Sequence, residues 1–258
     1  MATEVSQNAN GKYADLNGLK MYYEIHGSGK PLVLIHGSFG TTAGWSTVLP
    51  TLEKNRQVIA VELQGHGHTA DRDTPFSMEQ MADDVAELLK ALKISSADVF
   101  GYSMGGCVAL GLAIRHPELV GKLAVLGATA GATKDTYNPE SLKLLRSITP
   151  ANFNFPEVKD PYTKVAPDPS KWPVLVAKVV KLSSDFNGFS DKEIKSIKAQ
   201  TLIMLGDRDG VRPEHGVEMY RLIPNAQLAI FPGGDHFMLF MSPDKVLAAL
   251  VPFLDGGT

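Results

Sequence analysis

Short apolar runs of strand length recur along the chain, and segments with helical spacing of apolar residues separate most of them. The runs cover residues 19–25, 31–36, 57–63, 97–102, 122–128, 201–206 and 227–231. Strands that alternate with helices usually pair in parallel, because each connecting helix carries the chain back across one face of the sheet. The pattern therefore predicts an α/β fold, with a mostly parallel central sheet flanked by helices.

Two segments carry a strong helical signal. Residues 78–92 place their apolar side chains on one stripe, and Ser77 with Gln80 forms a capping-box pattern in front of it. Residues 104–115 are small and apolar, and the run stops just before Pro117, where continuation of a helix is disfavoured. Both helices are expected to pack against the sheet.

The first two apolar runs predict a local hairpin. Residues 20–31 contain a strand pattern, a Gly-Ser-Gly turn and the start of the next strand. This arrangement is typical of two antiparallel strands joined by a short loop. We therefore expect the two runs to pair with each other before the chain enters the parallel core.

Roughly 70 residues separate the run at 122–128 from the run at 201–206, too many for one crossover helix or a bare loop. We expect this segment to form an inserted helical cap over the carboxyl end of the sheet, where open α/β folds bind ligands. Its aromatic residues are Tyr137, Phe153, Phe155, Tyr162, Trp172, Phe186 and Phe189. Most of them are expected to form the cap's own core, and a few to face a substrate.

Length and composition fit a core in two parts, residues 1–130 and 199–258, interrupted by a cap at 131–198. The chain has 258 residues, of which 44% are hydrophobic, enough for a large buried core. Its net charge of −3 at pH 7 gives no electrostatic footprint for nucleic acid or anionic membranes. A small, neutral or weakly polar partner is therefore expected.

We expect no secretory leader and no membrane span, because no apolar run is long enough to cross a bilayer. Cys107 is the only cysteine, so no intrachain disulfide can form. Its place in a predicted helix favours a packed core residue over a second nucleophile. These features favour a cytoplasmic location and leave the oligomeric state open.

The most informative chemical motif is Gly101-Tyr102-Ser103-Met104-Gly105, which follows a predicted strand and opens a predicted helix. Gly-x-Ser-x-Gly in this setting is typical of a nucleophile elbow. The backbone turns so sharply there that a Cβ at either glycine would collide with neighbouring chain. The motif therefore predicts Ser103 as a nucleophile exposed above the sheet.

A serine hydroxyl needs a base to accept its proton and a third group to orient that base. His236 lies on a Gly-rich loop between a predicted strand and the last predicted helix, and Asp207 and Asp209 follow the strand at 201–206. Serine, acid and histidine then occur in the chain order expected for a strand-turn-helix nucleophile. Ser103, Asp209 and His236 are the predicted catalytic residues.

A developing oxyanion can be bound by backbone N–H groups. The loop after the strand at 31–36 and the start of the helix at 104–115 supply two donors, the N–H groups of Ser38 and Met104. His36 is expected to brace this loop by hydrogen bonds to backbone. The Gly-His-Gly-His string at 65–68 lacks the ligand spacing of a metal site, and no metal or cofactor is expected.

Together these residues resemble the α/β-hydrolases with a serine nucleophile and a helical cap, a group that includes bacterial carboxylesterases, lactonases and cofactor-free perhydrolases. The resemblance extends over about residues 13–255 and is weakest across the cap. In that family the acid usually stands three residues after the glycine that ends its strand, which implies Asp209 rather than Asp207. The turn after the fourth strand often begins with aspartate, where this chain has Glu62.

The resemblance implies hydrolysis of esters or lactones of small, mainly apolar compounds through an acyl-enzyme. Haloalkane dehalogenases and soluble epoxide hydrolases use an aspartate nucleophile, so Ser103 argues against both. Carbon-carbon hydrolases of ring-cleavage products often have Asn immediately before the serine, where this chain has Tyr102. They stay an alternative, as do perhydrolysis on the same triad and a non-catalytic small-molecule receptor with this fold.

Overall fold

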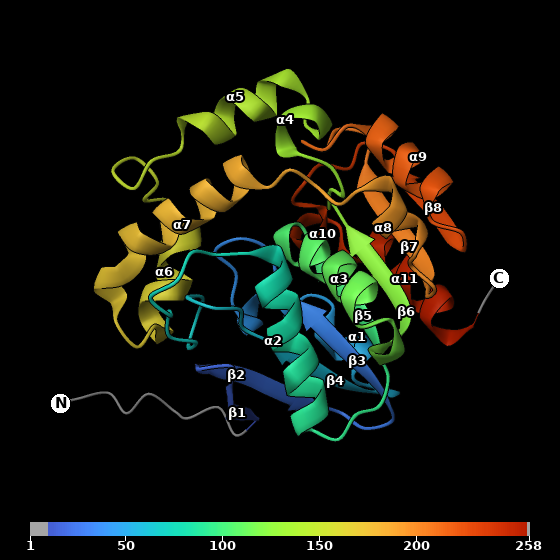
Figure 1. Ribbon diagram of the computed structural model, residues 1–258, viewed down its shortest axis with the longest axis horizontal. Coiled ribbons are helices and arrows are strands. Elements are labelled where there is room, and N and C mark those ends of the chain that lie inside the picture. The colour runs from blue at the N-terminus through green and yellow to red at the C-terminus, as the bar shows by residue number, and fades with distance from the viewer. Residues whose placement is uncertain (1–9, 257–258) are drawn as a thin grey trace.

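The computed structural model describes residues 10–256, and an eight-stranded sheet runs through its centre (Figure 1). The strands are β1 (Gly11–Leu16), β2 (Leu19–His26), β3 (Lys30–Ile35), β4 (Arg56–Val61), β5 (Ala97–Tyr102), β6 (Val120–Leu126), β7 (Gln200–Gly206) and β8 (Ala226–Phe231). Their order is β1-β2-β4-β3-β5-β6-β7-β8, and every pair from β4 to β8 is parallel. The predicted α/β class is confirmed.

The hairpin predicted from residues 20–31 is wrong. β2 pairs antiparallel with β1 and β4, whereas β3 pairs in parallel with β4 and β5. The hairpin that forms is β1–β2, and its turn residues Asn17 and Gly18 have φ angles of 50° and 74°. Such a turn matches the twist of the flanking strands, and Asn-Gly is its strongest sequence signal. β1 is largely polar, so apolar runs alone do not reveal it.

Helices cover both faces of the sheet (Figure 1). One face carries α2 (Met78–Ala91), α3 (Met104–Arg115), α8 (Asp191–Lys195) and α9 (Pro213–Leu222). The other carries the 3₁₀ turn η1 (Thr42–Trp45), α1 (Leu49–Leu52), α10 (Met238–Met241) and α11 (Pro243–Asp255). No helix within residues 10–256 is both long and apolar enough to cross a membrane.

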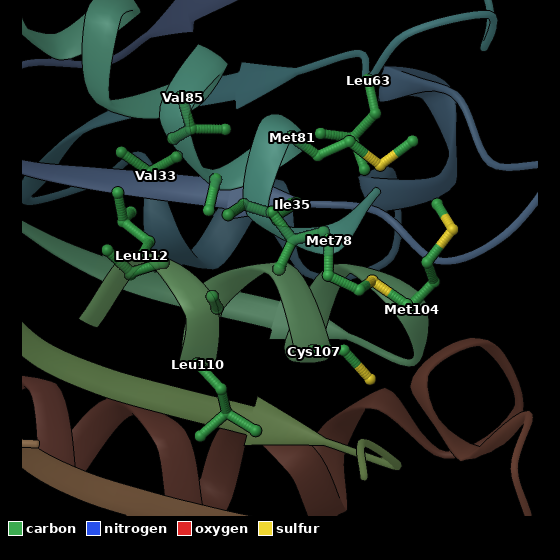
Figure 2. Packing of buried hydrophobic residues seen from close by; sticks show 14 of the residues in the cluster. Val33, Ile35, Leu63, Met78, Met81, Val85, Met104, Cys107, Leu110 and Leu112 are labelled. Carbon is green, nitrogen blue, oxygen red and sulfur yellow. The ribbon is translucent and has the colours of Figure 1, made fainter. Parts of the chain in front are cut away.

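Alternate residues of the central strands feed two separate cores, since successive side chains of a strand point to opposite faces. In β3, Val33 and Ile35 belong to the core beneath α2 and α3, and Leu34 belongs to the core beneath α11. Figure 2 shows the first of these cores, to which the buried Cys107 of α3 belongs. Burial raises the pKa of the Cys107 thiol to about 11, so it stays protonated at neutral pH and is a poor nucleophile.

A helical cap follows β6 (Figure 1). It contains α4 (Thr133–Thr136), α5 (Pro139–Ser147), α6 (Pro156–Val165), the 3₁₀ turn η3 (Pro169–Lys171) and α7 (Trp172–Asp185). The chain leaves and re-enters the core at one place, where Gly131 and Gly188 form a bridge and the N–H of Phe189 donates to the carbonyl of Ala130 at 2.7 Å. The predicted cap boundaries at residues 131 and 198 stay a prediction. Helix α8, which lies inside that range, packs beside the core helices α3 and α9.

A buried carboxylate ties four neighbouring strands together at their amino ends. Asp98 of β5 is fully buried and contacts Arg56 Nη1 of β4 at 3.0 Å and Lys30 Nζ of β3 at 2.9 Å. It also accepts the backbone N–H of Lys122 in β6 at 3.0 Å. Arg56 is itself nearly buried and also reaches Asp255 at the end of α11. Loss of Asp98 would therefore leave the buried Arg56 guanidinium with only the exposed Asp255 carboxylate as its partner.

Replacing Asp98 with alanine should lower the free energy of unfolding by about 3 to 5 kcal/mol, because Arg56 loses its buried counter-charge and removal of one partner of a buried ion pair is costly. Urea unfolding monitored by circular dichroism measures this change. Asp185→Ala is the matched control, since Asp185 forms an exposed ion pair with Lys181 on α7 and should leave stability almost unchanged. Equal effects of the two substitutions would contradict this assignment.

The loop after β4 is braced by a buried histidine. His66 Nδ1 donates to the carbonyl of Gln64 at 2.9 Å, and its ring lies 5.0 Å from that of His36 and 5.8 Å from that of Phe76. Its Nε2 has no partner among the described residues. Burial, with a smaller contribution from His36, lowers the pKa of His66 to about 3. His66 is therefore a neutral structural residue that braces this loop.

This histidine predicts a loss of stability on acidification. The unfolded chain binds a proton at His66 below its ordinary pKa of 6.5, whereas the folded chain does not until about pH 3. Ionisation of His66 therefore leaves the free energy of unfolding unaffected well above pH 6.5 and lowers it by about 2 kcal/mol at pH 5. Urea unfolding at pH 7 and pH 5 measures the decrease in the free energy of unfolding between the two pH values. In His66→Gln this decrease should be smaller than in wild type by about the same amount. An unchanged pH dependence in the variant would contradict the prediction.

Candidate active site

The turn between β5 and α3 consists of one residue, Ser103, with φ 53° and ψ −123°. A Cβ at Gly101 would collide with the backbone of the first turn of α3. A Cβ at Gly105 would collide with carbonyl oxygens at the end of β3. The two glycines thus let α3 start directly beside β3 and β5, which leaves the Ser103 side chain at the carboxyl edge of the sheet.

A continuous hydrogen-bond chain joins the three predicted catalytic residues. His236 Nε2 lies 2.9 Å from Ser103 Oγ, and His236 Nδ1 lies 2.9 Å from Asp209 Oδ1. Because Asp209 is buried and accepts from Nδ1, Nε2 is left to accept the serine proton. The side chain of His236 stays partly exposed. The geometry therefore joins a serine hydroxyl, an imidazole and a buried carboxylate in one hydrogen-bonded series.

The two candidate carboxylates after β7 do different things. Asp209 contacts His236 and also accepts the backbone N–H of Val211 at 3.0 Å, so its own position is fixed. Asp207 is exposed and accepts the N–H of Gly233 at 2.8 Å, which supports the loop that carries the histidine. The geometry therefore favours Asp209 as the acid, in line with the sequence prediction.

Tyr102 braces the histidine loop, a role that sequence reasoning missed. Its hydroxyl donates to the backbone carbonyl of His236 at 2.8 Å, and the two rings lie 5.4 Å apart. Burial, with the nearby Asp209 charge, raises the pKa of the Tyr102 phenol, so it remains a donor. The one signal in the sequence is its position next to Ser103, which does not identify a partner 134 residues away.

Asn138 fixes the acid loop from the cap side and was also missed. Its Nδ2 donates to the carbonyl of Asp209 at 3.1 Å, and its backbone N–H donates to the carbonyl of Gly210 at 2.9 Å. Its Oδ1 accepts the N–H of Ser141 at 2.8 Å and so caps α5. The Asn-Pro pair predicts this helix cap, but it does not predict the contact with the acid loop.

The loop with the first predicted oxyanion donor lies directly against Ser103. A Cβ at Gly37 would lie 3.0 Å from the Ser103 Cβ, and Ser38 is the next residue. Met104 is the first residue of α3, so its N–H has no acceptor within the helix and lies at the positive end of the helix dipole. The donor roles of Ser38 and Met104 stay predictions.

Both ends of this loop are fixed by the residues that follow β4. The N–H of Leu63 donates to His36 Nε2 at 3.1 Å, and His36 Nδ1 donates to the carbonyl of Gly37 at 2.7 Å. Burial lowers the pKa of His36, which keeps the ring neutral for this pair of bonds. At the other end, the N–H of Thr42 donates to the buried Glu62 carboxylate at 2.9 Å. His36 therefore braces the loop as predicted.

The chemistry available here is nucleophilic. Within residues 10–256, no group of three or more His, Cys, Asp or Glu side chains is arranged to hold a metal ion. A serine hydrogen-bonded to a histidine that a buried carboxylate orients can attack a carbonyl carbon and pass its proton to a leaving group. The arrangement is suited to acyl transfer.

Comparisons with known proteins agree with the fold. A 2-hydroxy-6-oxo-2,4-heptadienoate hydrolase from Pseudomonas putida is 30% identical over 248 residues, which cover 88% of this chain and 90% of that protein. A 2-hydroxymuconate semialdehyde hydrolase from a Pseudomonas species is 29% identical over 240 residues, 85% of each protein. The solved structure of a meta-cleavage product hydrolase from Pseudomonas fluorescens has a TM-score of 0.77 at 26% identity and covers 96% of this chain and 98% of its own.

A family model described as the alpha/beta hydrolase fold matches residues 30–162, the stretch that contains β3 to β6 and the elbow. This match covers half of the chain, and the relatives above extend the similarity over most of the remainder. Sheet order, elbow and cap position agree with it. The chain therefore belongs to the α/β hydrolase fold family.

Proposed function

We propose that this protein is a serine hydrolase that cleaves carboxylic esters or lactones of small, mainly apolar compounds through an acyl-enzyme. The observation that carries the proposal is the unbroken chain from Ser103 Oγ through His236 to Asp209, with both distances at 2.9 Å. A receptor that only binds a small molecule does not need a serine held against a base in this way. No cofactor is required by the reaction.

In the first half-reaction, Ser103 Oγ attacks the carbonyl carbon while His236 Nε2 takes its proton. The carbonyl oxygen becomes an oxyanion that would accept from the N–H groups of Ser38 and Met104. The imidazolium formed is stabilised by Asp209, which stays ionised. The tetrahedral intermediate then collapses, the bond to the alkoxide breaks, and His236 returns the proton to the leaving oxygen.

In the second half-reaction, water replaces the alcohol. His236 takes a proton from water as the water oxygen bonds to the acyl carbon. The second tetrahedral intermediate then collapses, the bond between the acyl carbon and Ser103 Oγ breaks, and His236 gives its proton to Ser103 Oγ as the carboxylic acid leaves. In a lactone the alcohol and the acid are parts of one product molecule. The same two steps therefore serve both substrate classes.

The proposed preference for small apolar substrates rests on the side chains around the triad. Tyr102 and Phe237 place aromatic rings within 6.0 Å of the His236 ring. Phe39 and the cap residue Phe153 contact each other beside the predicted oxyanion loop. Aromatic and aliphatic walls with few polar groups favour neutral acyl and alcohol groups.

Carbon-carbon bond hydrolysis is the second candidate. It is favoured by the two relatives at 29% and 30% identity, a 2-hydroxymuconate semialdehyde hydrolase and a 2-hydroxy-6-oxo-2,4-heptadienoate hydrolase, and by the solved structure of a meta-cleavage product hydrolase. It requires the same three residues, so the triad does not separate the two reactions. Tyr102 precedes the nucleophile where Asn is frequent in those enzymes, and its hydroxyl bonds to the His236 carbonyl. This difference is why ester or lactone hydrolysis is preferred.

The test is steady-state hydrolysis of p-nitrophenyl esters of increasing acyl length, a lactone series and 2-hydroxy-6-oxo-2,4-heptadienoate by wild type and Ser103→Ala. We expect the highest kcat/KM on a short ester or a lactone, and a loss of about 10⁴-fold or more in the variant, because the covalent path is removed. Ser184→Ala, an exposed serine of α7, is the matched control and should retain wild-type activity.

Three other results would contradict the proposal. A kcat/KM on the dienoate far above that on every ester and lactone would assign carbon-carbon hydrolysis instead. Equal ester turnover by wild type and Ser103→Ala would mean that another group is the nucleophile. No turnover of any compound, together with no labelling of Ser103 by a fluorophosphonate, would favour a receptor.

A further inference from the structure

Phe39 has an unusual backbone for a bulky residue. It follows Ser38, the first predicted oxyanion donor, and its φ is +64°. L-residues with large side chains rarely adopt this region. The N–H of Gly40 donates to the carbonyl of Gly37 at 3.0 Å and closes the turn locally, and the Phe39 ring makes further contacts outside the turn. Because Phe39 is bonded directly to Ser38, its position constrains the backbone of Ser38 and therefore where the Ser38 N–H lies.

The ring of Phe39 packs against two aromatic residues of the cap. Its ring lies 4.6 Å from that of Phe153 and 5.5 Å from that of Trp172. Trp172 is 1% exposed, and its indole N–H donates to the carbonyl of Phe153 at 2.9 Å, which fixes the two cap residues relative to each other. We call Phe39, Phe153 and Trp172 the aromatic bridge.

The loop is thus held by two different bodies. Its ends are hydrogen-bonded to the residues after β4, through His36 and Thr42. Its middle, at Phe39, packs on the cap. The bond between Ser103 and His236 joins two residues of the core. A displaced cap would leave that bond in place and remove the ring contacts at the middle of the loop, where the bond from the Gly40 N–H to the Gly37 carbonyl would remain.

We propose that the aromatic bridge positions the Ser38 N–H, so that the oxyanion site is complete only when the cap is docked. The inference rests on the proposed acyl-transfer function and deepens it, because it makes Phe39 and Phe153 positioning residues for the reaction. The oxyanion exists in the transition state and not in the bound substrate, so loss of the bridge should lower kcat and leave KM nearly constant.

The test is a double-mutant cycle with Phe39→Ala, Phe153→Ala and the double variant, assayed on the best ester or lactone. Each single variant should lower kcat on the order of 10- to 100-fold, with little change in KM, since small displacements of oxyanion donors have effects of this size. The double variant should be no slower than either single variant, because the same contact is lost in all three.

Two further variants separate positioning from general packing. Phe155→Ala removes a cap ring that contacts Phe153, and Phe155 is 57% exposed; it should keep wild-type kcat. Phe39→Tyr keeps the ring and should restore kcat to within a few-fold of wild type. If Phe153→Ala fails to give a cooperative thermal transition, Phe153→Leu replaces it in the cycle, because it keeps apolar volume without the ring.

Several outcomes would overturn the inference. Unchanged kcat in Phe39→Ala and Phe153→Ala, with Ser103→Ala inactive, would leave the proposed function intact and remove the bridge's role. Losses that add in the double variant would mean two independent packing defects. If wild type hydrolyses no ester or lactone, the same cycle is measured as the rate of fluorophosphonate labelling of Ser103, and equal labelling rates in all variants, or none in wild type, would refute the inference.

Discussion

The rest of the site depends on one backbone constraint, the single-residue turn at Ser103. Its φ of 53° is disfavoured for an L-residue, and strain of this kind costs about 1 to 3 kcal/mol. The turn persists because Gly101 and Gly105 let α3 start against β3 and β5 without collision. A hydrogen bond from the Ser103 N–H to the carbonyl of Leu126 at 2.8 Å also ties the turn to β6. Packing of the whole α3 face thus offsets local strain at the nucleophile.

The parallel sheet brings the other residues of the candidate site close to Ser103. The carboxyl ends of parallel strands lie along one edge, so the loops after β3, β5, β7 and β8 meet there. Each loop is then fixed by a polar bond to a neighbouring loop. Tyr102 holds the histidine loop, Asn138 holds the acid loop and Glu62 holds the loop that carries Ser38. Tyr102 and Glu62 are buried and Asn138 is partly buried, and hydrogen bonds shielded from water in this way help to define one geometry.

The sequence predicts this fold and the candidate triad because their signals are local. The apolar runs of the central strands, the glycines around Ser103 and the positions of Asp209 and His236 after strands can each be recognised within a few residues. β1 escapes the apolar pattern, since half of its side chains face solvent and its signal is the Asn-Gly turn that follows. The mistaken hairpin between the runs at 19–25 and 31–36 is the result.

The missed residues share a different property. Tyr102, Asn138 and Phe39 act through partners that are 71 to 134 residues away or in the cap. Such contacts depend on how loops from separate strands meet, and no spacing rule encodes them. The sequence could predict that the aromatic residues of the cap form a cluster. It could not predict that Phe39, a residue of the core, packs against that cluster. This is also why substrate preference is harder to predict than the triad.

The most direct test of the account is detection of the acyl-enzyme itself. Wild-type protein is mixed with a p-nitrophenyl ester, quenched in acid within milliseconds and digested, and the peptides are analysed by mass spectrometry. The account predicts an added acyl group on the peptide that contains Ser103, formed in step with a burst of p-nitrophenolate, and no such adduct in Ser103→Ala. Product formation with an unmodified Ser103 peptide at every time point, or with the acyl group on another residue, would contradict it.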